Sequence, residues 1–210
     1  MIGDQLTYHL SFKPITLLVI EKLKNELIKN KRICIAVGGE SGSGKSSLAF
    51  ALKSDIEESL NIKGYLFHAD DYFLLPPKTN HNKRLENIEN VGIAEVNLNL
   101  LDTHLKAFIN RENIIEKPLV DYSQNSIGKE IFNSKDYDFC IVEGTYAMLL
   151  KEPFFKIFIE NDFKATKERR MKRGRDILNE FNEKVLSIEH KIVKQHKGFA
   201  DMIINNDVER

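Results

Sequence analysis

The sequence predicts an α/β fold, a three-layer sandwich with a mostly parallel five-stranded sheet and small hairpin and lid insertions. Short continuous apolar runs, typical of strands buried on both faces, alternate with segments whose apolar residues recur every three or four positions, typical of helices. The chain has 210 residues, the length of one large domain. A single core is therefore expected.

The apolar runs and the helical spacings assign most of the chain. Strands are predicted at 33–37, 64–70, 138–144, 156–161 and 200–207, and two further extended segments at 114–122 and 128–133. Helices are predicted at 14–27, 48–60, 98–108, 164–176 and 177–192. The proline-rich and polar stretch 76–90 is predicted to be irregular and, for its length, functional.

These elements predict two parts of unequal size. Residues 1–32 form an N-terminal extension with one helix, which has proline in its first turn. Residues 33–210 form a single domain, with a lid at approximately 164–176.

Charge and cysteine content limit the partners of the chain. Lysine plus arginine equals aspartate plus glutamate, 31 against 31, which disfavours nucleic acid or an anionic membrane as the main partner. Cys34 and Cys140 lie inside apolar runs, away from any metal-ligand spacing, and are predicted to be buried reduced thiols. The longest N-terminal apolar stretch is six residues, too short for a signal peptide or a membrane span. We expect a cytoplasmic protein, and the sequence leaves open whether it forms homo-oligomers.

The stretch GGESGSGKS, residues 38–46, contains the phosphate-loop pattern GxxxxGK[ST]. It lies between a predicted buried strand and an amphipathic helix, as that mechanism requires, because backbone amides and the helix N-terminus then point at the phosphates. ATP and Mg²⁺ are therefore the expected cofactors, with Lys45 reaching the β and γ phosphates and Ser46 binding the metal. The residues expected to bind nucleotide are Gly39, Ser41, Gly42, Ser43, Gly44, Lys45, Ser46 and Ser47.

The other motifs favour phosphoryl transfer to a small molecule. The chain lacks the NKxD element that a GTPase uses to read its base, and no transporter-type signature loop is visible. A kinase needs an acidic group for the acceptor hydroxyl, a second near the metal, and mobile cations for the phosphoryl group. Asp70 or Asp71, which end a strand, can supply the first, and Glu143 the second. Four arginines in the predicted lid can supply the cations: Arg169, Arg170, Arg173 and Arg175.

These residues resemble uridine kinase and its relatives among the P-loop kinases, from Ile33 onward. The strings ADDYF, KPLVDY, IVEGTYA, RRMKRGRD and ADMII match family elements in order. The resemblance implies that Asp70 is the catalytic base and lies near the metal. It also implies an arginine-rich lid, in which Arg169 and Arg173 are the candidates to act on the phosphoryl group and Arg175 is the candidate to contact the nucleotide, and which arginine is the finger is left open.

The resemblance also implies an acceptor site, although some of its residues differ from the family pattern. The expected contacts are Asp70, Tyr72, Phe73, His81, Glu89, Asp121, Tyr122 and Asn125. Where uridine kinases place a tyrosine, a histidine and an arginine to hold the base, this chain has Val120, Asn125 and Ile127. Uridine or cytidine is the acceptor that the resemblance implies. The alternatives are a kinase of another small alcohol, such as a different nucleoside, a vitamin precursor or a sugar acid, and an ATP-binding switch without an acceptor.

Overall fold

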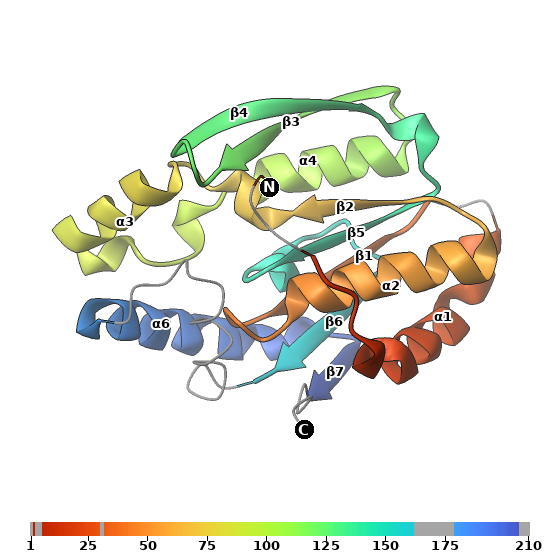
Figure 1. Cartoon of the computed structure of the whole chain (residues 1–210), viewed down its shortest axis with the longest axis horizontal. Helices are drawn as coiled ribbons and strands as arrows, with labels where there is room; N and C mark the ends of the chain where they lie inside the picture. The colour runs from red at the N-terminus through yellow and green to blue at the C-terminus, as the bar shows by residue number, and fades with distance from the viewer. Residues whose placement is uncertain (1, 3–5, 30–31, 162–178, 206–210) are drawn as a thin grey trace.

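The computed structural model describes residues 2, 6–29, 32–161 and 179–205. At its centre is a five-stranded sheet in the order β2-β5-β1-β6-β7, in which every neighbouring pair is parallel (Figure 1). The strands are β1 (Cys34–Gly39), β2 (Gly64–His68), β5 (Phe139–Gly144), β6 (Phe155–Glu160) and β7 (Met202–Asn205). The five predicted strands and the parallel sheet are confirmed.

Helices cover both faces of the sheet. Alternate residues of β1 point to opposite sides, so Ile35 and Val37 pack in one apolar cluster while Cys34 and Ala36 pack in the other. The first cluster contains α1 (Lys13–Ile28) and α2 (Lys45–Leu60), and the second contains α4 (Leu98–Ile109) and the end of α6 (Glu180–Val193). The predicted three-layer sandwich is therefore confirmed. The predicted helix at 164–176 lies outside the described residues.

A two-stranded antiparallel hairpin lies beside the main sheet (Figure 1). It consists of β3 (Ile114–Asp121) and β4 (Ser126–Asn133), the two extended segments predicted outside the main pattern. Phe132 of β4 stacks on Tyr65 of β2, with ring centroids 3.8 Å apart and planes 7° from parallel. This contact fixes one end of the hairpin against the edge of the sheet.

The prediction that 76–90 is irregular was wrong. Residues Pro77–Glu86 form the helix α3, which begins with Pro77 in its first turn and has Lys83 and Arg84 in its last. Its side chains are mostly polar, so hydrophobic periodicity could not reveal it. The helix is held instead by polar contacts: Asn80 and Arg84, one turn apart, both donate hydrogen bonds to Glu95.

The helix α1 is anchored to α2 by one buried carboxylate. Asp55 of α2 accepts hydrogen bonds from Thr16, from Tyr8 at 2.9 Å and from the Lys13 ammonium at 2.6 Å. Burial alone would raise the pKa of Asp55, but these hydrogen bonds outweigh burial and lower it. The segment expected as an N-terminal extension is therefore joined to the domain by a polar contact as well as by its apolar face.

This anchor predicts a pH-dependent stability. Because the folded-state pKa of Asp55 is depressed, its contribution is present above the unfolded pKa of about 4 and is lost as the pH falls through the lower folded value. At neutral pH, Asp55→Asn should lower the free energy of unfolding by about 1–3 kcal/mol. Urea unfolding between pH 2 and pH 7 should show the two proteins converging at low pH. The neighbouring Glu58→Gln, an exposed side chain, should stay within about 0.5 kcal/mol of wild type at all pH values.

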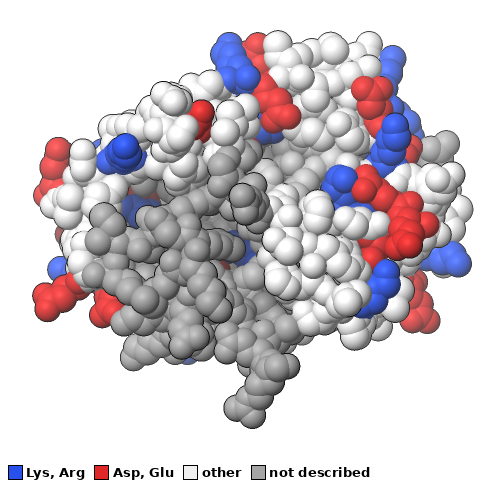
Figure 2. Space-filling view, viewed as in Figure 1, with Lys and Arg blue, Asp and Glu red and all other residues white. Residues whose placement is uncertain are grey.

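The surface carries both signs of charge. On the face seen in Figure 2, lysine and arginine side chains lie beside aspartate and glutamate over the described part of the molecule, in keeping with the equal totals of 31. Among the described helices, none is both long enough and apolar enough to cross a membrane.

Candidate active site

The glycine-rich loop joins the end of β1 to the start of α2, at the centre of the sheet edge. Gly39 has φ 145°, and a Cβ atom there would lie 2.6 Å from the carbonyl oxygen of Ile159. Gly44, which precedes α2, is left-handed with φ 96°. Both positions therefore require glycine. The Lys45 ammonium donates to the carbonyl of Glu40 at 2.8 Å, within the loop. This arrangement fits the phosphates of a nucleotide, which the loop amides and Lys45 would surround.

Two carboxylates lie at the same edge, where β2 and β5 end. Glu143 is the register partner of His68 in β2 and of Val37 in β1, and it accepts a hydrogen bond from His68 Nδ1 at 2.8 Å. Asp70 follows β2 in the 3-10 turn Ala69–Tyr72. The close approach of the two strand ends requires Gly144 after Glu143, since a Cβ there would lie 2.4 Å from the Cβ of Ala69.

Their surroundings shift the pKa values of the two carboxyl groups in opposite directions. Burial tends to raise the pKa of Glu143, but the His68 hydrogen bond, the charge of Lys45 and a hydrogen bond with Ser46 outweigh it and lower the pKa. Burial and the nearby charge of Glu143 raise the pKa of Asp70 above its ordinary value, although Lys45 opposes this. The arrangement suits two roles, a permanent anion beside a metal and a group that can accept a proton.

The Ser46 hydroxyl and the Glu143 carboxylate are suited to bind Mg²⁺, just as the loop is suited to bind phosphate. Both offer oxygen, the ligand that this ion prefers, and they lie together beside the loop. Mg²⁺ usually takes one or two protein ligands and completes its shell with phosphate oxygens and water. Such an ion would supply charge neutralisation for a nucleotide.

A pocket of about 800 Å³ opens next to the loop. This volume is within the range of small-molecule sites. Five of the residues predicted from the sequence line it: Ser41, Asp70, Phe73, His81 and Tyr122. Arg84 and Glu189 also line it and were not predicted from the sequence. Arg84 was hidden in the segment predicted to be irregular, and its spacing of four from Asn80 was the available signal.

Two predicted contacts belong to the hairpin turn instead of the pocket lining. Asp121 accepts hydrogen bonds from the Ser123 hydroxyl and from the backbone N–H groups of Gln124 and Ser123, which close the turn and lower the pKa of Asp121. The Asn125 side chain accepts from the backbone N–H of Lys78 at 2.7 Å and so holds the start of α3. Both the carboxamide and the carboxylate are thus engaged in local structure and neither residue lines the described pocket, so their contact with the acceptor stays a prediction.

Two more predicted contacts lie elsewhere. Tyr72 is buried, and its hydroxyl lies 2.9 Å from His104 Nδ1 in the core between β2 and α4. Glu89 is exposed in a 3-10 turn, where its backbone N–H donates to Asn87. Neither residue is part of the described pocket lining, because Tyr72 points into the core after Asp70 and Glu89 lies on the surface after α3. The four arginines of the predicted lid, Arg175 among them, lie outside the described residues.

The second aspartate of the DD pair has a structural contact. Asp71 is fully buried, accepts from the backbone N–H of Val120 at 3.0 Å and forms an ion pair with Lys117 at 2.8 Å. Lys117 is also almost completely buried and makes a second ion pair with Glu130. The pair joins the hairpin to the end of β2, so it positions the turn from which Asp70 reaches the pocket.

Breaking this pair should strongly destabilise the fold. Asp71→Asn leaves the Lys117 ammonium without its buried partner. Lys117→Met likewise leaves the buried Asp71 carboxylate without a counter-charge. Each should lower the free energy of unfolding by about 3–5 kcal/mol. In the double variant Asp71→Asn/Lys117→Met neither charge remains, so its loss should be clearly smaller than the sum of the two. Urea unfolding of all four proteins measures this coupling, and strictly additive losses would contradict it.

Comparison with known proteins places the chain among kinases. The model of the Phosphoribulokinase / Uridine kinase family matches residues 34–205. A uridine kinase from Streptococcus mutans is 26% identical over 193 residues, covering 86% of this chain and 90% of that protein. A uridine kinase from Bacillus mycoides is 28% identical over 190 residues, covering 83% and 86%.

Solved structures share the fold. A possible uridine kinase from Bacillus stearothermophilus has a TM-score of 0.60 at 16% identity, covering 89% of this chain and 99% of that one. Phosphoribulokinase from Rhodobacter spheroides has a TM-score of 0.65 at 11% identity, covering 84% and 70%. The family match spans all five strands of the sheet and the loop, Asp70 and Glu143 that meet at its edge. The chain therefore belongs to the Phosphoribulokinase / Uridine kinase family and is an ATP-dependent kinase of small molecules.

Proposed function

We propose that the protein transfers the γ-phosphoryl group of ATP to a hydroxyl of a small molecule bound in the pocket beside Asp70. The observation that supports this most is spatial. The phosphate loop, Glu143 and Asp70 lie at one edge of the sheet, and Ser41 of the loop lines the same pocket as Asp70. An acceptor in this pocket would meet the end of a triphosphate.

Each group has a proposed role. The loop amides and Lys45 bind the phosphates, and Ser46 with Glu143 binds Mg²⁺, which neutralises phosphate charge. Asp70 orients the acceptor hydroxyl and takes its proton as the new O–P bond forms. Its raised pKa favours this role, because a base with a very low proton affinity accepts a proton poorly. For the predicted lid we propose that Arg169 and Arg173 stabilise the transferring group and that Arg175 contacts the nucleotide.

The identity of the acceptor is a separate proposal. The names of the relatives favour uridine, and the resemblance adds cytidine. Against this, Val120 lines the pocket without a side-chain hydrogen-bonding group, and the Asn125 carboxamide is engaged by α3. The family's three base-holding positions therefore leave little side-chain hydrogen bonding for a base, and such a site discriminates weakly in favour of a nucleoside unless other lining residues, such as Tyr122 or His81, take over this role. We therefore propose that uridine is a poor substrate compared with some other hydroxyl compound.

The test is a screen for acceptor-dependent ADP release. Uridine, cytidine, nicotinamide riboside, pantothenate, glycerate and free sugars would be compared at identical magnesium-ATP. At least one compound should raise ADP release well above the rate without acceptor. A kcat/KM for uridine above about 10⁵ per molar per second, inside the ordinary range of enzymes, would overturn the proposal on uridine. Release that no acceptor stimulates would favour the alternative of an ATP-binding switch.

The cellular location of the protein is a proposal as well. Cys34 and Cys140 are both buried, and they form no disulfide with each other. Burial raises the pKa of the Cys34 thiol, which keeps it unreactive. Reduced buried thiols agree with a cytoplasmic location, which we propose for this chain.

A further inference from the structure

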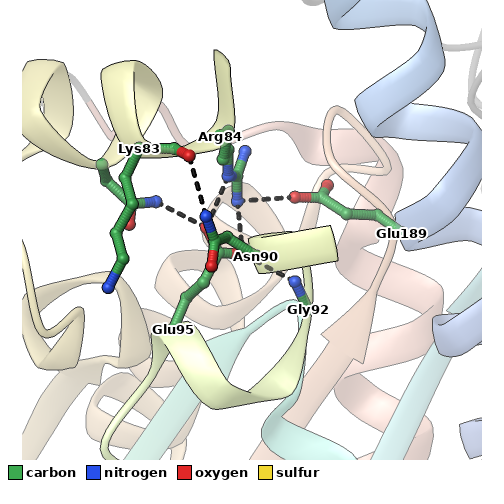
Figure 3. Close-up of polar contacts among 7 residues, drawn as sticks. Lys83, Arg84, Asn90, Gly92, Glu95 and Glu189 are labelled. Carbon is green, nitrogen blue, oxygen red and sulfur yellow. Dashed lines mark hydrogen bonds and ion pairs between the residues drawn. The ribbon is translucent and has the colours of Figure 1, made fainter. Parts of the chain in front are cut away.

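The pocket contains a cluster of charges that phosphate transfer does not use. Arg84 of α3 lies between two carboxylates that come from different segments, Glu95 before α4 and Glu189 of α6 (Figure 3). Arg84 Nε and Nη2 donate to the two oxygens of Glu95 at 2.5 and 2.8 Å, and Nη2 also donates to Glu189 Oε1 at 3.0 Å. The guanidinium is therefore fixed in position and orientation.

Glu95 anchors this cluster and is not itself exposed to the pocket. It is buried, and it also accepts hydrogen bonds from Asn80 and from the backbone of Gly92, both at 2.8 Å. With four donors around it, Glu95 has no capacity left for a ligand. Arg84 and Glu189, in contrast, both line the pocket.

One polar atom of each remains for a ligand. Arg84 Nη1 and Glu189 Oε2 make no hydrogen bond to any residue in the described part of the chain. The first is a donor and the second is an acceptor, and the 3.0 Å contact between the two side chains holds them next to each other. A pair of adjacent hydroxyls complements such a pair, because one hydroxyl can accept from the guanidinium while its neighbour donates to the carboxylate.

The charge of the cluster excludes an acidic ligand. One guanidinium faces two carboxylates, so the cluster carries a net negative charge when both are ionised. Burial, followed by the charge of Glu95, raises the pKa of Glu189, while Arg84 opposes the shift. With or without a proton on Glu189, no net positive charge is available for a ligand. The described lining also includes two other basic side chains, His81 and Lys78, and Lys78 is exposed, where solvent weakens its attraction.

Asp70 adds to this field. Burial raises the pKa of the Tyr146 phenol, and the charges of Glu189, Glu95 and Asp70 all raise it further. One buried ring is thus within electrostatic reach of both the cluster and Asp70. A carboxylate-bearing molecule in the pocket would meet the carboxyl groups of Glu189 and Asp70, which both line it, whereas the carbon skeleton of a neutral one can pack on Phe73 and Leu186.

We infer that Arg84 and Glu189 form the subsite that selects the acceptor, and that this subsite takes a neutral compound with two adjacent hydroxyls and rejects its carboxylate-bearing counterpart. The inference rests on the proposed kinase function, because it assigns the acceptor class for that same pocket.

Matched pairs that differ by a carboxylate test the inference directly. The probes are glycerol and glycerate, ribitol and ribonate, and uridine and orotidine. Binding is measured by calorimetry in the presence of magnesium-ADP, and kcat/KM by ADP release. Within each pair whose neutral member binds, the acid should bind at least about 10-fold more weakly, because like charges in a partly buried site repel. Equal or tighter binding of the acid would overturn the inference, as would the failure of every neutral probe to bind.

Glu189→Gln assigns the selectivity to the subsite. The variant keeps the size of the side chain but removes its charge, so the preference for the neutral member should fall by about 10-fold or more, chiefly through KM. Glu180→Gln is the control, since Glu180 is exposed on the same helix and outside the pocket lining. Arg84→Lys, which keeps the charge that Glu95 needs, should also weaken binding of the neutral probe. An unchanged preference in Glu189→Gln would overturn the assignment.

The two proposals fail in different ways. Neutral probes that bind with the expected preference but never stimulate ADP release would refute the kinase function of the pocket and leave the subsite intact. ADP release that acidic probes stimulate best would support the kinase function and refute the subsite.

Discussion

The Asp70→Asn variant is expected to lose about two orders of magnitude or more of turnover, while its affinity for magnesium-ATP stays within a few fold of wild type. The carboxylate lines the acceptor pocket, and its proton affinity is raised by burial and by Glu143. An asparagine carboxamide has nearly the same shape but cannot accept the proton of the hydroxyl, a loss typically worth about 10²- to 10⁴-fold. Acceptor-dependent ADP release gives the turnover, and calorimetry with magnesium-ATP gives the affinity.

Two controls separate chemistry from folding. Asp136→Asn changes an exposed aspartate in the turn before β5 and should leave turnover and stability unchanged. Asp71→Asn should lower stability through Lys117, yet below its unfolding transition it should retain more turnover than Asp70→Asn. If folded Asp71→Asn were the less active of the two, the assignment of the base would be wrong.

The sequence was sufficient where burial forces a simple pattern. A strand covered on both faces must be apolar at every position, so β1 and β5 could be located from runs of four or five residues. The phosphate loop was equally readable, because positive φ at Gly39 and Gly44 leaves few other choices. Once the strands were known to be parallel, Asp70 and Glu143 were predicted at the same sheet edge, which the structure confirms.

Polar contacts between distant segments could not be predicted in this way. The helix α3 is stabilised by Glu95 and Glu189, which follow its arginine by 11 and 105 positions, so no local window contains the reason for its formation. The same holds for Asn125, whose carboxamide supports α3 across 47 positions. A short-range pattern records propensity and burial, whereas these contacts depend on the tertiary fold. The acceptor pocket is built largely from them, so its residues were predicted less well than the loop.

The Lys45→Ala variant should lose nearly all phosphoryl transfer. The Lys45 ammonium is buried at the start of α2, donates to the loop carbonyl of Glu40, and lowers the pKa values of both Asp70 and Glu143 by its charge. Its charge therefore acts on both carboxylates as well as on the phosphate cradle. Without it, the charge that develops on the phosphoryl group loses a fixed counter-charge, a change that costs on the order of 10²- to 10³-fold for one such donor. The two carboxylates would also bind protons more readily.

Lys53→Ala provides the matched comparison, because Lys53 lies two turns further along the same helix and pairs only with Glu57 among the described residues. Its turnover should stay within about twofold of wild type, since a partly exposed i, i+4 pair on a helix contributes only about 0.3–0.5 kcal/mol to stability. Calorimetry with magnesium-ATP and acceptor-dependent ADP release would be measured for both variants, with thermal unfolding to verify that each is folded. Folded Lys45→Ala that bound magnesium-ATP and turned over like Lys53→Ala would show that this loop does not hold the phosphates, and the proposed site would have to be placed elsewhere in the molecule.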